Sequence, residues 1–168
     1  MSEGTYQPRT VPQVVADAAA AQGDRIAITD GGVNLTYTEL DAARVQSAQA
    51  FIAAGVGKGD RVAIWAPNIY RWILAAIGAQ TIGAVVVPLN TRYKGPEAAY
   101  VLNASGARLL FTVGDFLGVS YPDLLKDQDL PHLERMVTLS GEAAGTLGWD
   151  DFLAAGQGVA VSEVTARA

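Results

Sequence analysis

Residues 36–112 read TYTELDAARVQSAQAFIAAGVGKGDRVAIWAPNIYRWILAAIGAQTIGAVVVPLNTRYKGPEAAYVLNASGARLLFT, and this stretch decides the fold. Three short apolar runs, at 61–65, 84–87 and 109–112, alternate with longer segments that have apolar residues at helical spacing. Such alternation is typical of a parallel sheet whose strands are joined by crossover helices. The sequence therefore predicts an α/β fold with a mostly parallel sheet.

A helix and a β-hairpin are expected before the second helix of the chain. The helix runs from Thr10 to Gly23 with a small apolar face that includes Val11 and Val14. The hairpin pairs 26–29 with 33–37 around Asp-Gly-Gly, which supplies the positive φ of a tight turn.

The start of the helix that follows the hairpin is well specified. Thr36 and Glu39 have the spacing of a capping box, and Gly55 lies where a left-handed C-cap would fall. The segment 55–60, GVGKGD, resembles a phosphate loop in composition, but it follows a helix and precedes a strand. We interpret it as a tight helix-to-strand connection.

Asn68 is expected to cap the next helix.

The signals weaken after the third apolar run. An irregular helix broken at Pro122 is expected within 115–125, a fourth strand at 136–139, a loop at 141–148 and a short helix at 149–153. The expected domain organisation is a flexible arm at 1–9, one α/β subdomain at 10–155, and a linker or frayed end at 156–168.

Composition narrows the function classes. The chain has 168 residues, a formal net charge of −5, one histidine and no cysteine. A negative balance without a basic stripe argues against nucleic-acid binding, and the lack of cysteine excludes disulfides and thiolate chemistry. No window is apolar enough to span a bilayer, so we expect a cytoplasmic protein. With 50% hydrophobic and 17% charged residues, some apolar surface is expected to pair with another subunit or with further polypeptide.

Known catalytic patterns are absent from the sequence: it contains no nucleophile elbow, no Walker motif and no HExxH helix. We interpret His132 as an exposed loop residue. Asp150 and Asp151 are adjacent on a helix and point apart, so they suit its N-terminal dipole better than a metal. No catalytic or metal-ligating residue is therefore predicted.

Arg92 is the candidate binding residue. It lies in the loop 88–93, PLNTRY, directly after the second predicted strand, and open α/β sheets bind ligands at the carboxyl ends of their strands. A planar guanidinium can bind a phosphate or carboxylate through two hydrogen bonds. A structural ion pair is the competing interpretation.

The segment 36–93, with GVGKGDRVAIWAPN and GAVVVPLNTRY at its centre, closely resembles the start of the adenylate-forming, AMP-forming acyl-CoA synthetases. The resemblance extends from about Thr10 to Phe152 and is greatest to bacterial, actinobacterial-like fatty-acid:CoA ligases, including those acting on steroid-derived acids. It implies the N-terminal part of the large domain of such an enzyme. The full enzyme would use ATP, Mg²⁺ and coenzyme A to convert a carboxylic acid to a thioester through an acyl-adenylate.

The family's phosphate loop, adenine motif and C-terminal lysine have no counterpart in these 168 residues, so the resemblance implies that this chain alone is inactive and binds no cofactor. Arg92 matches a position that in some of these ligases helps to hold the phosphates of CoA. Two alternatives from other classes stay open: a self-contained doubly wound nucleotide- or flavin-binding module, and a non-catalytic interaction domain.

Overall fold

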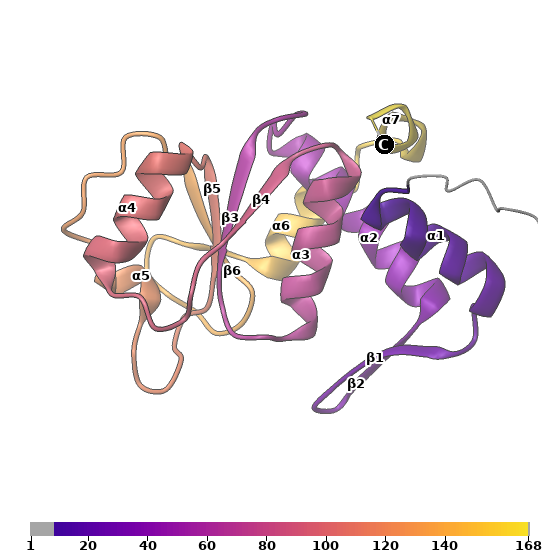
Figure 1. Cartoon of the computed structure of the whole chain (residues 1–168), viewed down its shortest axis with the longest axis horizontal. Helices are drawn as coiled ribbons and strands as arrows, with labels where there is room; N and C mark the ends of the chain where they lie inside the picture. The colour runs from indigo at the N-terminus through magenta and orange to yellow at the C-terminus, as the bar shows by residue number, and fades with distance from the viewer. Residues whose placement is uncertain (1–8, 168) are drawn as a thin grey trace, which may run out of the picture.

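A five-stranded parallel sheet forms the centre of the protein in a computed structural model that describes residues 9–167 (Figure 1). The strand order is β4-β3-β5-β6-β7. These strands are β3 (Arg61–Trp65), β4 (Val85–Pro88), β5 (Leu109–Thr112), β6 (Arg135–Thr138) and β7 (Leu147–Gly148). The expected parallel α/β fold is confirmed. All but the last residue of the expected arm at 1–9 lies outside the described residues.

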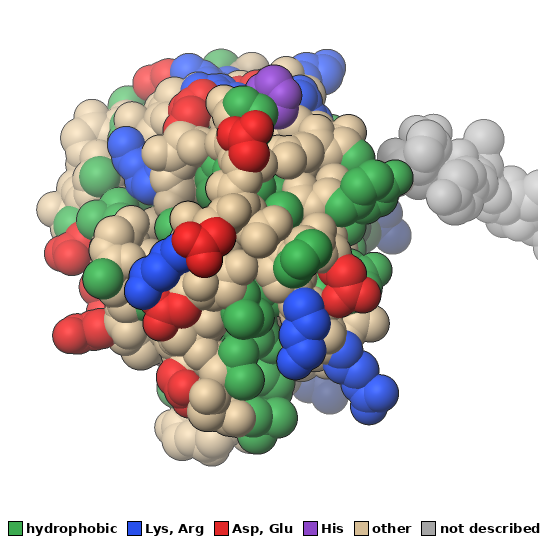
Figure 2. Space-filling view, turned by 90° about the vertical axis from the view of Figure 1, so that its left-hand side faces the viewer, with side chains coloured by type: hydrophobic (Ala, Val, Ile, Leu, Met, Phe, Trp, Pro, Cys, Tyr) green, Lys and Arg blue, Asp and Glu red, His purple; other side chains and the backbone are tan. Residues whose placement is uncertain are grey.

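Helices cover both faces of this sheet. They are α1 (Val11–Gln22), α2 (Tyr37–Ala53), α3 (Tyr70–Thr81), α4 (Gly95–Ser105), α5 (Tyr121–Leu124), α6 (Trp149–Ala155) and α7 (Val161–Arg167). Helices α3 and α6 lie on one face with α2, and α4 and α5 lie on the other (Figure 1). Helices α1 and α7 pack against α2. On the outer side of α4 and α5, acidic and basic side chains are interspersed among apolar ones (Figure 2).

Aromatic side chains fill the space between the sheet and its helices. On the side of α2 and α6, Phe111 contacts Phe51, Phe152 and Trp149, with ring centroids 5.1–6.1 Å apart. Aromatic pairs at such distances add to the stabilisation from burial alone. This cluster is the centre of the core.

The hairpin forms a separate two-stranded sheet from β1 (Ile26–Asp30) and β2 (Val33–Thr36), with Gly31 at φ +57° in its turn. The capping box is also present: Thr36 Oγ1 accepts from the Glu39 amide at 3.2 Å, and Glu39 Oε2 accepts from the Thr36 amide at 2.8 Å. The hydrogen bonds that the Thr36 amide and the Thr36 hydroxyl donate to the Glu39 carboxylate lower the pKa of Glu39. Both sequence expectations are confirmed.

The expectation that Asn68 caps α3 is wrong. Asp30, at the end of β1, accepts a hydrogen bond from the Tyr70 amide at 2.8 Å through its Oδ2 atom. The N-cap position is Ile69, whose side chain makes no capping bond. The free amide of Tyr70 at the start of α3 is thus bonded by a residue distant in sequence instead of by the expected neighbouring cap. The same bond fixes the hairpin to α3.

Replacing Asp30 by alanine is therefore expected to lower the free energy of unfolding by about 0.5–2 kcal/mol, the usual cost of losing a capping oxygen. Urea denaturation of Asp30→Ala against the parent protein measures this loss. The exposed Asp24, in the turn between α1 and β1, supplies the control Asp24→Ala. Equal effects of the two substitutions would contradict a capping role for Asp30.

Four other expectations differ from the structure. The apolar run at 84–87 is typical of a strand buried on both faces, but β4 is an edge strand and Val85 is 49% exposed. Pro122 lies in the first turn of α5 and begins that helix instead of breaking one, as proline lacks only an amide that is unpaired there. Within 156–168, expected as a linker or frayed end, α7 forms and buries Val164. The loop expected at 141–148 ends in the short strand β7.

The amino ends of the strands are joined by Arg108. Its guanidinium bonds Glu134 at 2.7 Å, Asp60 at 2.5 Å and the Gly55 carbonyl at 3.2 Å. The bond to Glu134 is the main cause that raises the pKa of Arg108, and the same bond lowers the pKa of Glu134. The segment 55–60 is thus a structural connection, as expected, with Gly57 donating to Asp60 at 2.9 Å.

Candidate functional site

The loop that follows β4 has a defined conformation at the carboxyl edge of the sheet. The Leu89 amide donates to the Ile64 carbonyl of β3 at 2.9 Å, which extends the strand pairing by one residue. Asn90 Oδ1 then accepts from the Arg92 amide at 2.9 Å, and the Tyr93 amide donates to the Asn90 carbonyl at 3.1 Å. Asparagine side chains commonly form such turns. The backbone of Arg92 is therefore fixed in place.

Two aromatic residues, Trp65 and Tyr121, hold this loop by hydrogen bonds to its carbonyl groups. The indole Nε1 of Trp65 donates to the Asn90 carbonyl at 3.0 Å, and the Tyr121 hydroxyl donates to the Thr91 carbonyl at 2.8 Å. The two rings stack on each other with centroids 4.3 Å apart and an interplanar angle of 17°. Burial raises the pKa of the Tyr121 hydroxyl.

The carboxyl-edge groove is a cavity of about 210 Å³ beside this loop. It is lined by Thr91, Arg92, Tyr93, Lys94, Phe116, Leu117, Val119, Tyr121 and Leu124. Arg92 and Lys94 are the charged members of this lining, and both are exposed. Two cations beside aromatic and aliphatic walls suit a ligand that carries a phosphate on an apolar or ring-bearing body.

Arg92 makes no ion pair with a carboxylate within residues 9–167. The competing interpretation, a structural ion pair, therefore finds no partner in the described part of the chain. Its guanidinium is available to a ligand from solvent. Binding of an anion by Arg92 stays a prediction.

The other wall of the groove did not follow from the sequence. It comes from the segment after β5, where Phe116 and Val119 form an isolated antiparallel bridge with bonds of 3.0 and 3.2 Å. Leu117, at the tip, has φ +54° and is 86% exposed. Lys94 was missed although it stands two residues after Arg92. That spacing was the one signal available for it.

The remaining charged candidates do not form a site. His132 is exposed in a loop, as expected. Asp150 lies 3.5 Å from Arg71, whose guanidinium also donates to the Leu139 carbonyl at 2.7 Å. The residues described by the structure contain no cluster of three or more potential metal ligands. None of the helices in this part of the chain has the length and apolar character needed to cross a membrane.

Comparison with known proteins shows the family to which this chain belongs. The family model described as AMP-binding enzyme matches residues 15–161, so the chain belongs to the AMP-binding enzyme family. It is 38% identical, over 98% of its length, to the 7a-methyl-1,5-dioxo-octahydro-1H-inden-4-yl propanoyl:CoA ligase of Rhodococcus jostii. It is 42% identical, over 95% of its length, to the ligase of the same name from Mycobacterium tuberculosis.

A solved structure agrees with this assignment. The N-terminal domain of FACL13 from Mycobacterium tuberculosis superposes with a TM-score of 0.75 at 25% identity, over 92% of this chain and 37% of that one. The match confirms the expected resemblance to the N-terminal region of adenylate-forming enzymes. The chain spans about a third of the length of the curated relatives it matches, 33% of the Rhodococcus ligase and 31% of the mycobacterial one.

Proposed function

We propose that this chain is the N-terminal portion of an AMP-forming carboxylic acid:CoA ligase. The observation that carries the proposal is the carboxyl-edge groove, with Arg92 and Lys94 at its rim, in a chain of the AMP-binding enzyme family. The two curated relatives named above are CoA ligases, and the name of each specifies a ring-bearing propanoyl group. A fatty acid or a steroid-derived acid is accordingly the proposed substrate class.

In this proposal the groove binds part of coenzyme A. Arg92 and Lys94 fit a phosphate of CoA, and the aromatic rings of Tyr93 and Phe116 fit an adjoining ring or apolar chain. ATP and Mg²⁺ would supply the activation that turns the acid into an acyl-adenylate. The residues of this chain are assigned no part in that step.

The test is an assay of the product of the complete reading frame that contains this sequence. Incubation with ATP, Mg²⁺ and a candidate acid is expected to release pyrophosphate, and addition of CoA is expected to give the acyl-CoA thioester. Residues 1–168 alone are expected to do neither. Formation of thioester without release of pyrophosphate would contradict an AMP-forming mechanism.

In the complete enzyme, Arg92→Ala is expected to raise the KM for CoA by about tenfold or more, because a charge-assisted hydrogen bond contributes about 1.5–3 kcal/mol. Release of pyrophosphate in the absence of CoA is expected to be unchanged. Steady-state kinetics of the two half-reactions separate these effects.

The matched control for Arg92→Ala is Lys126→Ala, which removes a surface cation that pairs with Asp123 outside the groove. If the KM for CoA stays constant in Arg92→Ala, or if both half-reactions slow in parallel, the assigned role of Arg92 is wrong.

Self-association, a cytoplasmic location and the use of Mg²⁺ stay predictions. Val85 on the edge strand β4 and Tyr100 on α4 are exposed apolar residues, 49% and 75% exposed. The exposed valine on an edge strand supports pairing of this edge with further polypeptide or with a second copy. The predicted cytoplasmic location depends on a sequence without an apolar window long enough to span a bilayer, and the cysteine-free composition suits it.

A further inference from the structure

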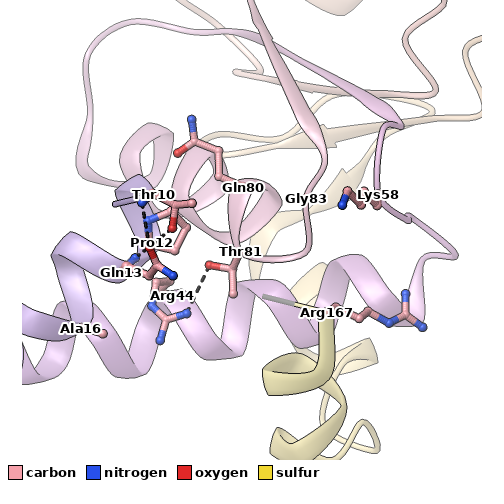
Figure 3. Close-up of a pocket in the computed structure, with 10 residues that line it drawn as sticks. All are labelled: Thr10, Pro12, Gln13, Ala16, Arg44, Lys58, Gln80, Thr81, Gly83 and Arg167. Atoms are coloured by element: carbon pink, nitrogen blue, oxygen red, sulfur yellow. Dashed lines mark hydrogen bonds between the residues drawn. The ribbon is translucent and has the colours of Figure 1, made fainter. Parts of the chain in front are cut away.

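A second cavity, of about 350 Å³, lies at the opposite edge of the sheet from the carboxyl-edge groove. Four helices and two connections surround it: α1, α2, the end of α3, α7, and the turns that precede β3 and β4 (Figure 3). The lining residues are Thr10, Pro12, Gln13, Ala16, Arg44, Lys58, Gln80, Thr81, Gly83 and Arg167. We refer to it as the amino-edge pocket.

The charges in this lining all have one sign. Arg44, Lys58 and Arg167 come from three separate elements, and none of the lining residues in the described part of the chain is an aspartate or glutamate. This concentration of positive charge occurs in a protein whose formal net charge is −5. A concave site lined by one sign of charge focuses the field on small ions of the opposite sign.

Nearby carboxylates reduce this charge without removing it. Asp41 accepts from Arg44 Nε at 2.8 Å, and Glu163 accepts from Arg167 Nη2 at 2.7 Å. Lys58 has no ion pair within residues 9–167. Three cations and two acids leave one positive charge in excess.

Two of the basic side chains are held in position. Arg44 has 11% of its side chain exposed, and its Nη1 atom donates to Thr81 Oγ1 at 3.2 Å. The Lys58 stem packs over Gly83, where an added Cβ would lie 3.0 Å from Lys58 Cγ and where φ is +76°. Because position 83 is a glycine, the lysine stem can lie this close to the backbone that lines the pocket. Figure 3 shows Arg44 and Lys58 on opposite sides of Thr81 and Gly83.

We propose that the amino-edge pocket binds a compact polyanion of the phosphate or diphosphate class. Its volume is within the range of small-molecule sites, and the amides of Gln13 and Gln80 add uncharged polar groups to the cations. Lys58 and Gly83 precede their strands, whereas Arg92 follows β4, so the site is separate from the proposed CoA groove. The inference does not depend on the proposed function.

Occupation of this pocket would connect elements that are distant in sequence. A ligand that contacts Arg44, Lys58 and Arg167 joins α2 to the α2–β3 turn and to α7. Any ligand that binds the folded state alone raises the melting temperature in proportion to the logarithm of its concentration. The expected effect is therefore a stabilisation of the folded protein by the anion.

The experiment uses sodium pyrophosphate as the probe, with EDTA present so that no divalent cation takes part. Isothermal titration and thermal unfolding of residues 1–168 are expected to show saturable binding, weakened at high ionic strength. Lys58→Ala is expected to weaken the affinity about tenfold or more, since it removes one charge-assisted contact. Lys58 is exposed, so this variant is expected to fold like the parent chain.

Two controls locate the binding. Arg92→Ala, at the other edge of the sheet, and Lys126→Ala, on the surface, are each expected to leave the affinity for pyrophosphate within about twofold of the parent. Three outcomes would overturn the proposal: no saturable binding, loss of binding in Arg92→Ala, or equal weakening by Lys58→Ala and Lys126→Ala. Because the Arg92 variant is included, a failure here is distinct from a failure of the CoA site.

Discussion

Replacing Phe111 by alanine is expected to lower the free energy of unfolding by about 3–5 kcal/mol, the usual cost of deleting a fully buried aromatic ring. Phe111 is 0% exposed and lies in the middle strand of the sheet, where it contacts Phe51 and Phe152 at 5.2 and 5.1 Å. Its removal leaves a cavity between β5, α2 and α6. The loss is a large part of the about 5–15 kcal/mol by which domains are stable.

Urea denaturation followed by circular dichroism measures this change for residues 1–168. Phe116→Ala is the matched control, since it deletes the same ring from the partly exposed loop after β5. Phe111→Leu retains most of the apolar volume and is expected to lose much less than Phe111→Ala. Similar midpoints for Phe111→Ala and Phe116→Ala would show that the aromatic cluster is not the centre of the core.

Local signals in the sequence were sufficient for most elements of the fold. The capping box of Thr36 and Glu39 fixed the start of α2, and Gly55 has the expected left-handed φ of +76°. The apolar runs at 61–65 and 109–112 became the central strands β3 and β5. Each of these features depends on residues that are close in sequence, so no knowledge of strand order was needed.

Features that depend on distant residues were not predicted. A run of valines in β4 satisfies the pattern of a buried strand, but its place at the edge is set by the order in which strands pair. The cap of α3 comes from Asp30, which is 40 residues away from Tyr70. Likewise, α7 is a short polar segment that becomes ordered by burying Val164.

The candidate site likewise has a part that neighbouring residues predict and a part that depends on distant residues. Arg92 was identified because it directly follows a parallel strand, a relation that the sequence contains. The residues that hold the loop around Arg92 were not identified, because the bond from the Tyr121 hydroxyl to the Thr91 carbonyl joins residues 30 positions apart. The amino-edge pocket had no sequence signal at all, since its three cations come from 44, 58 and 167. Residues that are scattered along a chain become a site only through packing.

The contact between α2 and α3 shows how little space this packing leaves between helices. Gly78 lies in α3 where an added Cβ would come 2.3 Å from the Cβ of Ser47 and 3.2 Å from its carbonyl carbon. Both residues are buried and both belong to long helices, so neither can move alone. Glycine at 78 is therefore required by the approach of the two helices, although alanine is the better helix former.

Gly78→Ala is accordingly expected to destabilise the protein by about 1–3 kcal/mol, because overpacking outweighs the gain in helix propensity. The partner substitution is Ser47→Gly, which removes the atom that the new methyl group would meet. Ser47 Oγ is buried without a hydrogen-bond partner in the described residues, so its loss breaks no bond. Ser47→Gly alone is expected to cost less than about 1 kcal/mol.

A double-mutant cycle tests this contact directly. Urea denaturation of the parent, both single variants and the double variant is expected to give a favourable coupling energy of about 1–2 kcal/mol. The carbonyl carbon of Ser47 stays in place, so the double variant recovers only part of the loss. Additive effects of the two substitutions would mean that α2 and α3 separate freely at this point. The helical layer that forms one wall of the amino-edge pocket would then be less rigid than the contact distances imply.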